Sequence, residues 1–113
     1  LATTDGNYVY LSGQFSVDPE TGNKIFGTID QELKQILINI DLILHEAGSR
    51  RENIMKSTLY INSLENWSEA DRVYSEFFGS SRHSRTIVAI PELHYGFKVE
   101  MDVVACCDNR GSK

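Results

Sequence analysis

An arginine and two acidic residues near the end of the chain are the first candidates for chemistry. Arg85 begins an apolar stretch, and Glu100 and Asp102 alternate with apolar residues along a later one. If these stretches are strands that pair as a hairpin, Arg85 comes close to Glu100. An arginine suits a planar clamp on a carboxylate, and a nearby carboxylate can take a proton from water. The alternative is a cross-strand ion pair of Arg85 with Glu100 or Asp102, which contributes little on a surface.

Other residue types lack the spacing that metal or nucleotide binding needs. The histidines, His45, His83 and His94, lie far apart, and none is followed by a second metal ligand two to four positions later. Cys106 and Cys107 are adjacent, so a disulfide between them would link no distant segments, and we expect two reduced thiols at a strand end. We therefore expect no metal site and no glycine-rich nucleotide loop.

Composition and charge narrow the class of protein. The chain has 113 residues, 41% hydrophobic and 24% charged, as in ordinary globular proteins. This length suits one domain over residues 1–113, with residues 108–113 expected to fray. The formal net charge of −5 disfavours nucleic acids and anionic membranes as partners. No apolar run approaches the ~20 residues that span a bilayer and the start is not a signal peptide, so we expect a soluble, cytoplasmic protein.

Hydrophobic periodicity and turn residues predict the elements that position these side chains. Strands are predicted at about 8–15, 24–26, 54–61, 85–90 and 97–106. Helices are predicted at 28–47, with a capping box of Thr28 and Gln31, and at 63–78. The second helix has an expected inner stripe of Trp67, Ala70, Val73, Tyr74 and Phe77. Since each helix has one apolar stripe, both should cover one face of a mixed sheet, which gives a two-layer α+β fold of order ββαβαββ.

The predicted strands 54–61 and 97–106 each carry a mixed second face. On strand 54–61, Met55, Ser57, Leu59 and Ile61 should face the core. On the last strand, Glu100 and Asp102 share the face opposite the core with the apolar Val104. Apolar side chains on a face that no helix covers favour packing against another subunit over plain solvation.

Seven short segments stand out by their order and spacing. They are VYLSGQ at 9–14, DPETG at 18–22, EAG at 46–48, KSTLY at 56–60, VYSEFF at 73–78, SRT at 84–86 and VEMD at 99–102. Together, over residues 6–106, they resemble the RidA family, also known as the YjgF family. The resemblance implies a chorismate-mutase-like fold and a homotrimer whose sheets pack into a central barrel, with active sites in the clefts between subunits.

The resemblance also implies an activity and a set of site residues. The activity is hydrolysis of reactive enamines and imines, such as 2-aminoacrylate, 2-iminopropanoate and 2-iminobutanoate, to 2-keto acids and ammonia, with no cofactor. Arg85 matches the arginine that holds the substrate carboxylate, and Glu100 matches the glutamate that positions or activates water. Ser12 and Gly13 match the corner that lines the pocket, and Ile87 matches a position whose backbone contacts the ligand.

Two positions depart from the family pattern. Asp71 stands where the family has an asparagine one turn before Tyr74, and a carboxylate there would repel a substrate carboxylate if it pointed inward. We therefore count Asp71 among the substrate-binding candidates. His94 replaces the proline of a Leu-Pro pair. Two other functions stay open: a non-catalytic trimer that binds carboxylate metabolites and regulates a partner, and an endoribonuclease or translation inhibitor, which the charge disfavours.

Overall fold

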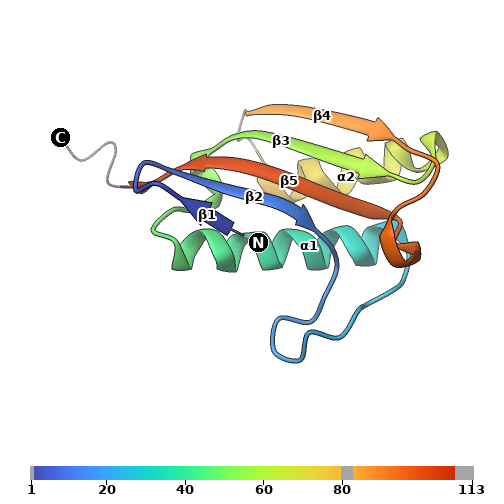
Figure 1. Ribbon diagram of the computed structural model, residues 1–113. Coiled ribbons are helices and arrows are strands. Elements are labelled where there is room, and N and C mark those ends of the chain that lie inside the picture. Colours follow the sequence, from blue (N-terminus) through green and yellow to red (C-terminus); the bar gives the residue numbers. More distant parts are fainter. Residues whose placement is uncertain (1, 80–82, 109–113) are drawn as a thin grey trace.

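Two helices cover one face of a five-stranded mixed sheet in the computed structural model, which describes residues 2–79 and 83–108 (Figure 1). The strands are β1 (Ala2–Thr4), β2 (Tyr8–Gln14), β3 (Ile54–Ile61), β4 (Ser84–Ala89) and β5 (Val99–Cys106). The helices are α1 (Ile29–Glu46) and α2 (Trp67–Phe78), with short 3-10 helices η1 (Arg51–Asn53), η2 (Leu64–Asn66) and η3 (His94–Gly96). The predicted two-layer α+β fold is confirmed. No helix in the described ranges is long and apolar enough to cross a membrane.

The strand order β1-β2-β5-β3-β4 places the last strand in the middle of the sheet. β3 and β4 are parallel and are joined by α2, while the other pairs are antiparallel. A parallel pair needs a crossover connection, and α2 supplies it while covering the sheet. Residues 90–98 then carry the chain past β3, so β5 pairs with β3 and β2 and not with β4. The hairpin that the sequence left open for the last two strands is therefore not formed.

The order ββαβαββ is observed, but one of its strands is not the predicted one. Residues 24–26 form no strand, and Lys24 makes a single isolated bridge with Val17. Backbone hydrogen bonds between Asp18 and both Gly22 and Asn23 close this segment into a loop. The strand that sequence reasoning missed is β1, whose residues are all exposed, so no apolar alternation marks it.

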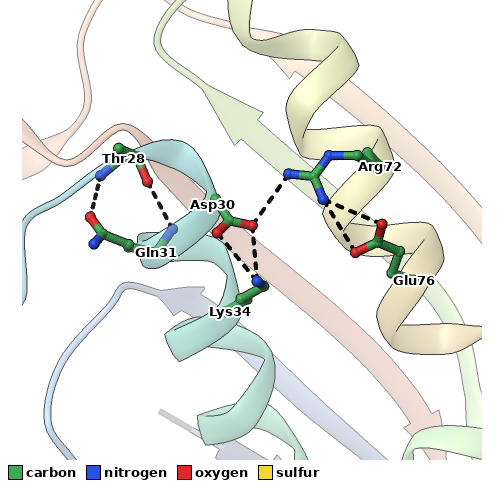
Figure 2. A network of polar contacts seen from close by, with 6 residues as sticks. All are labelled: Thr28, Asp30, Gln31, Lys34, Arg72 and Glu76. Carbon is green, nitrogen blue, oxygen red and sulfur yellow. Dashed lines mark hydrogen bonds and ion pairs between the residues drawn. The ribbon is translucent and has the colours of Figure 1, made fainter.

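The start of α1 follows the predicted capping box and is linked to α2 (Figure 2). Thr28 Oγ1 accepts from the Gln31 amide at 3.2 Å, and Gln31 Oε1 accepts from the Thr28 amide at 2.9 Å. Asp30 then pairs with Lys34 on its own helix at 3.2 Å and with Arg72 of α2 at 3.4 Å. These side chains are partly exposed, so each pair contributes little to the stability of the fold.

The inner face of α2 differs from the predicted stripe. Its buried residues are Ala70, Val73, Tyr74 and Phe78. Trp67, the first residue of the α-helix, is 40% exposed, and Phe77 is half-buried. The core face of β3 also differs at Met55, which is exposed. A bulge between Ile54 and Lys56 leaves Met55 without a partner in the register with β5.

Arg51 holds the C-terminal end of α2 against α1. Its Nε and Nη2 donate to the two carboxylate oxygens of Asp41 at 3.2 and 2.9 Å. Its Nη1 donates to the carbonyl oxygen of Phe77 at 3.2 Å, and its guanidinium lies 3.9 Å from the centroid of the Phe77 ring. One side chain therefore joins η1, α1 and the last turn of α2.

We expect Arg51→Ala to lower the free energy of unfolding by about 2 kcal/mol, because a paired carboxylate and a helix-end carbonyl lose their donor. Arg50→Ala is the matched control, since the Arg50 side chain is 64% exposed and pairs with the exposed Asp108. We expect it to cost less than about 0.5 kcal/mol. Urea unfolding followed by circular dichroism measures both, and equal losses would contradict the role of Arg51.

Candidate functional site

Arg85 lines a cavity of about 360 Å³ between the edge strand β4 and helix α2. In the register of the sheet Arg85 pairs with Ser57 of β3, whose side chain is buried beneath α2. Arg85 therefore lies on the helix-covered face, the face of the sheet that α1 and α2 pack on. The other residues that line the cavity are Asp71, Tyr74, Ser75, Phe78, Gly79 and His83.

The guanidinium of Arg85 is held by one carboxylate and two aromatic rings. Its Nη1 donates to Oδ1 of Asp71, which places the two opposite charges side by side. Its Cζ lies 5.2 Å from the centroid of Tyr74 and 5.9 Å from that of Trp67, close enough for cation–π attraction. A guanidinium has five N–H donors, and this pair uses one of them.

A hydrogen-bonded chain runs from the sheet to the segment that precedes Arg85. The hydroxyl of Tyr74 bonds to Ser57 Oγ on one side and to His83 Nε2 on the other. Burial raises the pKa of Tyr74 to about 12, although the bond to Ser57 and the charge of Arg85 oppose it. Burial and the charge of Arg85 lower the pKa of His83, so its ring is neutral at pH 7. The chain therefore fixes His83 beside Arg85 without adding a second cation.

Glu100 lies on the opposite side of the sheet, which we call the uncovered face. It alternates along β5 with Val99 and Met101, which are fully buried beneath the helices. Burial raises the pKa of Glu100, and the negative charge of Asp102 raises it further. The charge of His94 lowers this pKa, but by less than burial and Asp102 raise it. This carboxyl group therefore holds its proton more tightly than an ordinary glutamate does.

The corner at Ser12 and Gly13 is brought against Glu100 by a bulge in β2. The register with β5 shifts between Leu11 and Gln14, and Gly13 adopts a φ of 59°. A Cβ atom at Gly13 would lie 3.3 Å from Oε2 of Glu100, so a larger residue would be both strained and tight there.

Asp102 fixes this corner from the neighbouring position on β5. The amide of Gly13 donates to Asp102 Oδ1 at 2.7 Å, and the Tyr60 hydroxyl donates to Asp102 Oδ2 at 3.2 Å. Burial, with the charge of Asp102, raises the pKa of Tyr60, so its hydroxyl keeps the proton that it donates. Gly13 thus lies beside Glu100 and Asp102, and the exposed Ser12 precedes it on the same bulge.

The sheet itself separates this group from Arg85. Arg85 is in register with Ser57 and, through it, with Val103 on the helix-covered face. Glu100 is in register with Tyr60 and points the other way. Ile87 belongs with Arg85, since its side chain is partly buried against the core. The predicted approach of Arg85 to Glu100 within one chain is therefore wrong, and so is the cross-strand pair, because Arg85 is bound to Asp71.

Two cavity residues, Tyr74 and His83, were not predicted as part of a site. Tyr74 was expected only as a core residue of the second helix, and His83 stood alone in the sequence. These two residues are linked only by tertiary contacts, because Tyr74 bonds to both Ser57 of β3 and His83. No local sequence pattern marks such a link. The two cysteines are free, as expected. Among the described residues, no three His, Cys, Asp or Glu side chains gather as metal ligands would.

The similarity of this chain to known proteins extends over nearly its whole length. Residues 2–107 match the family model described as endoribonuclease L-PSP. A RutC family protein of Pyrococcus abyssi is 36% identical over 100 residues, which cover 88% of this chain and 79% of that protein. A 2-iminobutanoate/2-iminopropanoate deaminase of Bos taurus is 34% identical over 97 residues, which cover 86% of this chain and 71% of that protein.

A solved structure agrees with these sequence matches. The crystal structure of yeast Mmf1 superposes with a TM-score of 0.89 at 29% sequence identity, covering 95% of this chain and 85% of that one. The strand order, the two helices on one face and the matched length thus have a known counterpart. The chain belongs to the RidA (YjgF) family, whose family model is described as endoribonuclease L-PSP.

Proposed function

We propose that this protein hydrolyses reactive 2-imino acids, of the 2-iminobutanoate and 2-iminopropanoate type, to 2-keto acids and ammonia. The observation that carries the proposal is Arg85, a cation held between a carboxylate and two rings in a cavity of about 360 Å³. This volume suits a small acid. Relatives of Bos taurus and Homo sapiens at 34% and 30% identity are named as such deaminases, which supports the reaction type.

Arg85 suits the carboxylate of a 2-imino acid. The substrate is planar, and the planar guanidinium fork can hold its carboxylate in a fixed orientation. The positive charge also draws electrons away from the adjacent C=N carbon, which makes that carbon more open to attack by water. The rings of Tyr74 and Trp67 limit the tilt of the guanidinium.

Glu100 suits the proton transfers of the hydrolysis. Its raised pKa makes its carboxylate a stronger base than an ordinary glutamate. Water forms a bond to the imine carbon as one of its protons passes to Glu100. That proton then goes to the nitrogen, which gives a carbinolamine. Glu100 next takes the proton of the hydroxyl and passes it to the nitrogen as the C–N bond breaks, so ammonia leaves and the hydroxyl oxygen becomes the keto oxygen of the product.

The two groups can meet only across a subunit boundary. Because Arg85 and Glu100 lie on opposite faces of one sheet, the proposed site takes Arg85 from one subunit and Glu100 from another. A homotrimer whose uncovered faces turn inward as a barrel provides such an arrangement. The uncovered face also carries half-buried apolar side chains, among them Val88 and Val104, which a neighbouring subunit would cover.

The direct test is to follow ammonia and keto acid release from freshly generated 2-iminobutanoate. We expect the purified protein to accelerate hydrolysis in proportion to its concentration and to sediment at about 38 kDa, three times 12.8 kDa. Binding of substrate-like acids without acceleration would support the non-catalytic alternative instead. RNA cleavage that a point mutation abolishes, with no imine hydrolysis, would support the endoribonuclease. A monomer would contradict the shared site.

A further inference from the structure

Asp71 places a carboxylate directly beside the proposed carboxylate anchor. It lines the same cavity as Arg85, and its carboxylate accepts from Arg85 Nη1. The side chains are 36% and 24% exposed, so the pair is partly shielded from solvent. Arg72, the next residue of α2, is bound to Asp30 and Glu76 instead of Asp71 (Figure 2).

The charges that one chain contributes to the cavity therefore come as one close pair. Among its described residues, Arg85 supplies the cation and Asp71 the anion. Tyr74 and His83 do not change this balance at pH 7, because burial raises the pKa of the first and lowers that of the second. A simple carboxylate bound to the remaining donors of Arg85 meets repulsion from Asp71, which offsets part of the attraction.

We propose that this cavity selects zwitterionic ligands, with the ligand carboxylate on Arg85 and a protonated nitrogen on Asp71. An α-amino or protonated α-imino acid carries its two charges on neighbouring groups, as the pair of Asp71 and Arg85 does. Each charge of the ligand then lies against its opposite on this chain. The pair therefore recognises both the carboxylate and the protonated nitrogen of the ligand.

This inference deepens the proposed deaminase activity and, for the reaction itself, rests on it. The protonated imine is the form that water attacks most readily, and Asp71 favours that form by binding its N–H. The 2-keto acid product has lost the nitrogen and is a simple anion. It therefore binds less tightly than the substrate, which favours its release.

Two stable probes that differ only in the charged nitrogen test the selection. They are L-2-aminobutanoate, a zwitterion, and butanoate, an anion with the same carbon chain, each titrated at pH 7 by NMR. We expect the assembled wild-type protein to bind the zwitterion about tenfold more tightly. Asp71→Asn should lower the affinity for the zwitterion about tenfold and raise the affinity for butanoate about tenfold. Butanoate should then bind more tightly than the zwitterion. Asp71→Ser provides a second variant with the same expected reversal.

Glu76→Gln is the charge-matched control. It removes one negative charge from the same helix, at a side chain that is 61% exposed and bound to Arg72. We expect it to change neither affinity by more than about twofold. Arg85→Ala should abolish binding of both probes, and zwitterion binding that survives this change would place the binding elsewhere and overturn the inference.

The inference is also overturned if the wild type binds both probes equally or binds neither, or if Asp71→Asn shifts both affinities in the same direction. These readouts are separate from the deaminase assay, because neither probe is hydrolysed. An active enzyme with unselective binding would contradict the zwitterion inference alone. Selective binding without imine hydrolysis would contradict the proposed function alone.

Discussion

Arg85→Ala is expected to lower kcat/KM for 2-iminobutanoate by about a thousandfold, as removal of a preorganised charged donor does in comparable sites. The loss has two parts. The substrate loses its planar anchor, and the electron-withdrawing charge beside the imine carbon disappears. In addition, Asp71 stays in the cavity without its partner, so the variant presents an unpaired carboxylate to an anionic group. Stopped-flow measurement of ammonia release gives kcat/KM directly.

Two further variants separate these contributions. Arg85→Lys keeps the charge and loses the fork, so we expect an intermediate loss of about thirtyfold. Arg72→Ala is the matched control, because Arg72 is an arginine beside the same site whose contacts all lie outside the cavity. We expect less than a twofold change in that variant. Activity of Arg85→Ala within about threefold of wild type would exclude Arg85 as the anchor.

Arg85→Ala also tests whether the site is shared between subunits. When Arg85→Ala and Glu100→Gln proteins are unfolded together and refolded at equal amounts, about three quarters of random trimers are mixed. Each mixed trimer has one boundary of three at which an intact Arg85 meets an intact Glu100. We therefore expect recovery of about a quarter of wild-type activity from two inactive parents. No recovery from refolded mixed trimers would contradict a site that combines Arg85 of one subunit with Glu100 of another.

The helices and the central strands could be predicted from sequence because each carries a local signal. Helix α1 has its capping box and an apolar face, and β5 alternates apolar and acidic residues from Val99 to Val103. The short strand β1 has no such signal, since all of its residues are exposed. Pairing was less predictable than the strands themselves, because nothing near Ser84 tells whether β4 pairs with β3 in parallel or with β5 as a hairpin.

The candidate residues could be chosen from the sequence, but their arrangement could not. Residue type singled out Arg85 and Glu100, and the family resemblance added Ser12, Gly13, Ile87 and Asp71. Which residues meet depends on the face of the sheet that each occupies, and the β2 bulge that brings Gly13 to Glu100 follows from a register shift that no local pattern marks. The pairing of Arg85 with Asp71 in turn depends on the parallel docking of β4 beside α2.

Glu100→Gln is expected to lower kcat by about a hundredfold to a thousandfold, because the amide keeps the shape of the side chain and cannot accept a proton from water. The affinity for L-2-aminobutanoate should stay within about twofold, since the carboxylate anchor is Arg85 and not Glu100. Activity assays and NMR titrations measure the two effects separately. A large loss of affinity with unchanged kcat would assign Glu100 to binding instead of proton transfer.

The pH dependence of kcat/KM in the wild type independently tests the role of Glu100 as the base. The reaction needs its carboxylate form, so kcat/KM should fall as pH decreases through the pKa of Glu100. Because burial and Asp102 raise that pKa, the fall should begin at a higher pH than for an ordinary glutamate. Glu100→Gln should remove this acid limb while keeping any limb that arises from the substrate.

Asp102→Asn connects this pH dependence to the geometry of the uncovered face. Burial is the larger cause of the raised pKa and persists in the variant, while the repulsion between the two carboxylates is lost. The acid limb of kcat/KM should therefore move to lower pH without reaching the position of an exposed glutamate. An asparagine oxygen can still accept from the Gly13 amide, so the corner should stay in place. Glu76→Gln, which removes an equal charge from α2, should leave the limb where it is. If the limb does not move in Asp102→Asn, or moves equally in Glu76→Gln, then Glu100 is not the group whose titration controls the reaction.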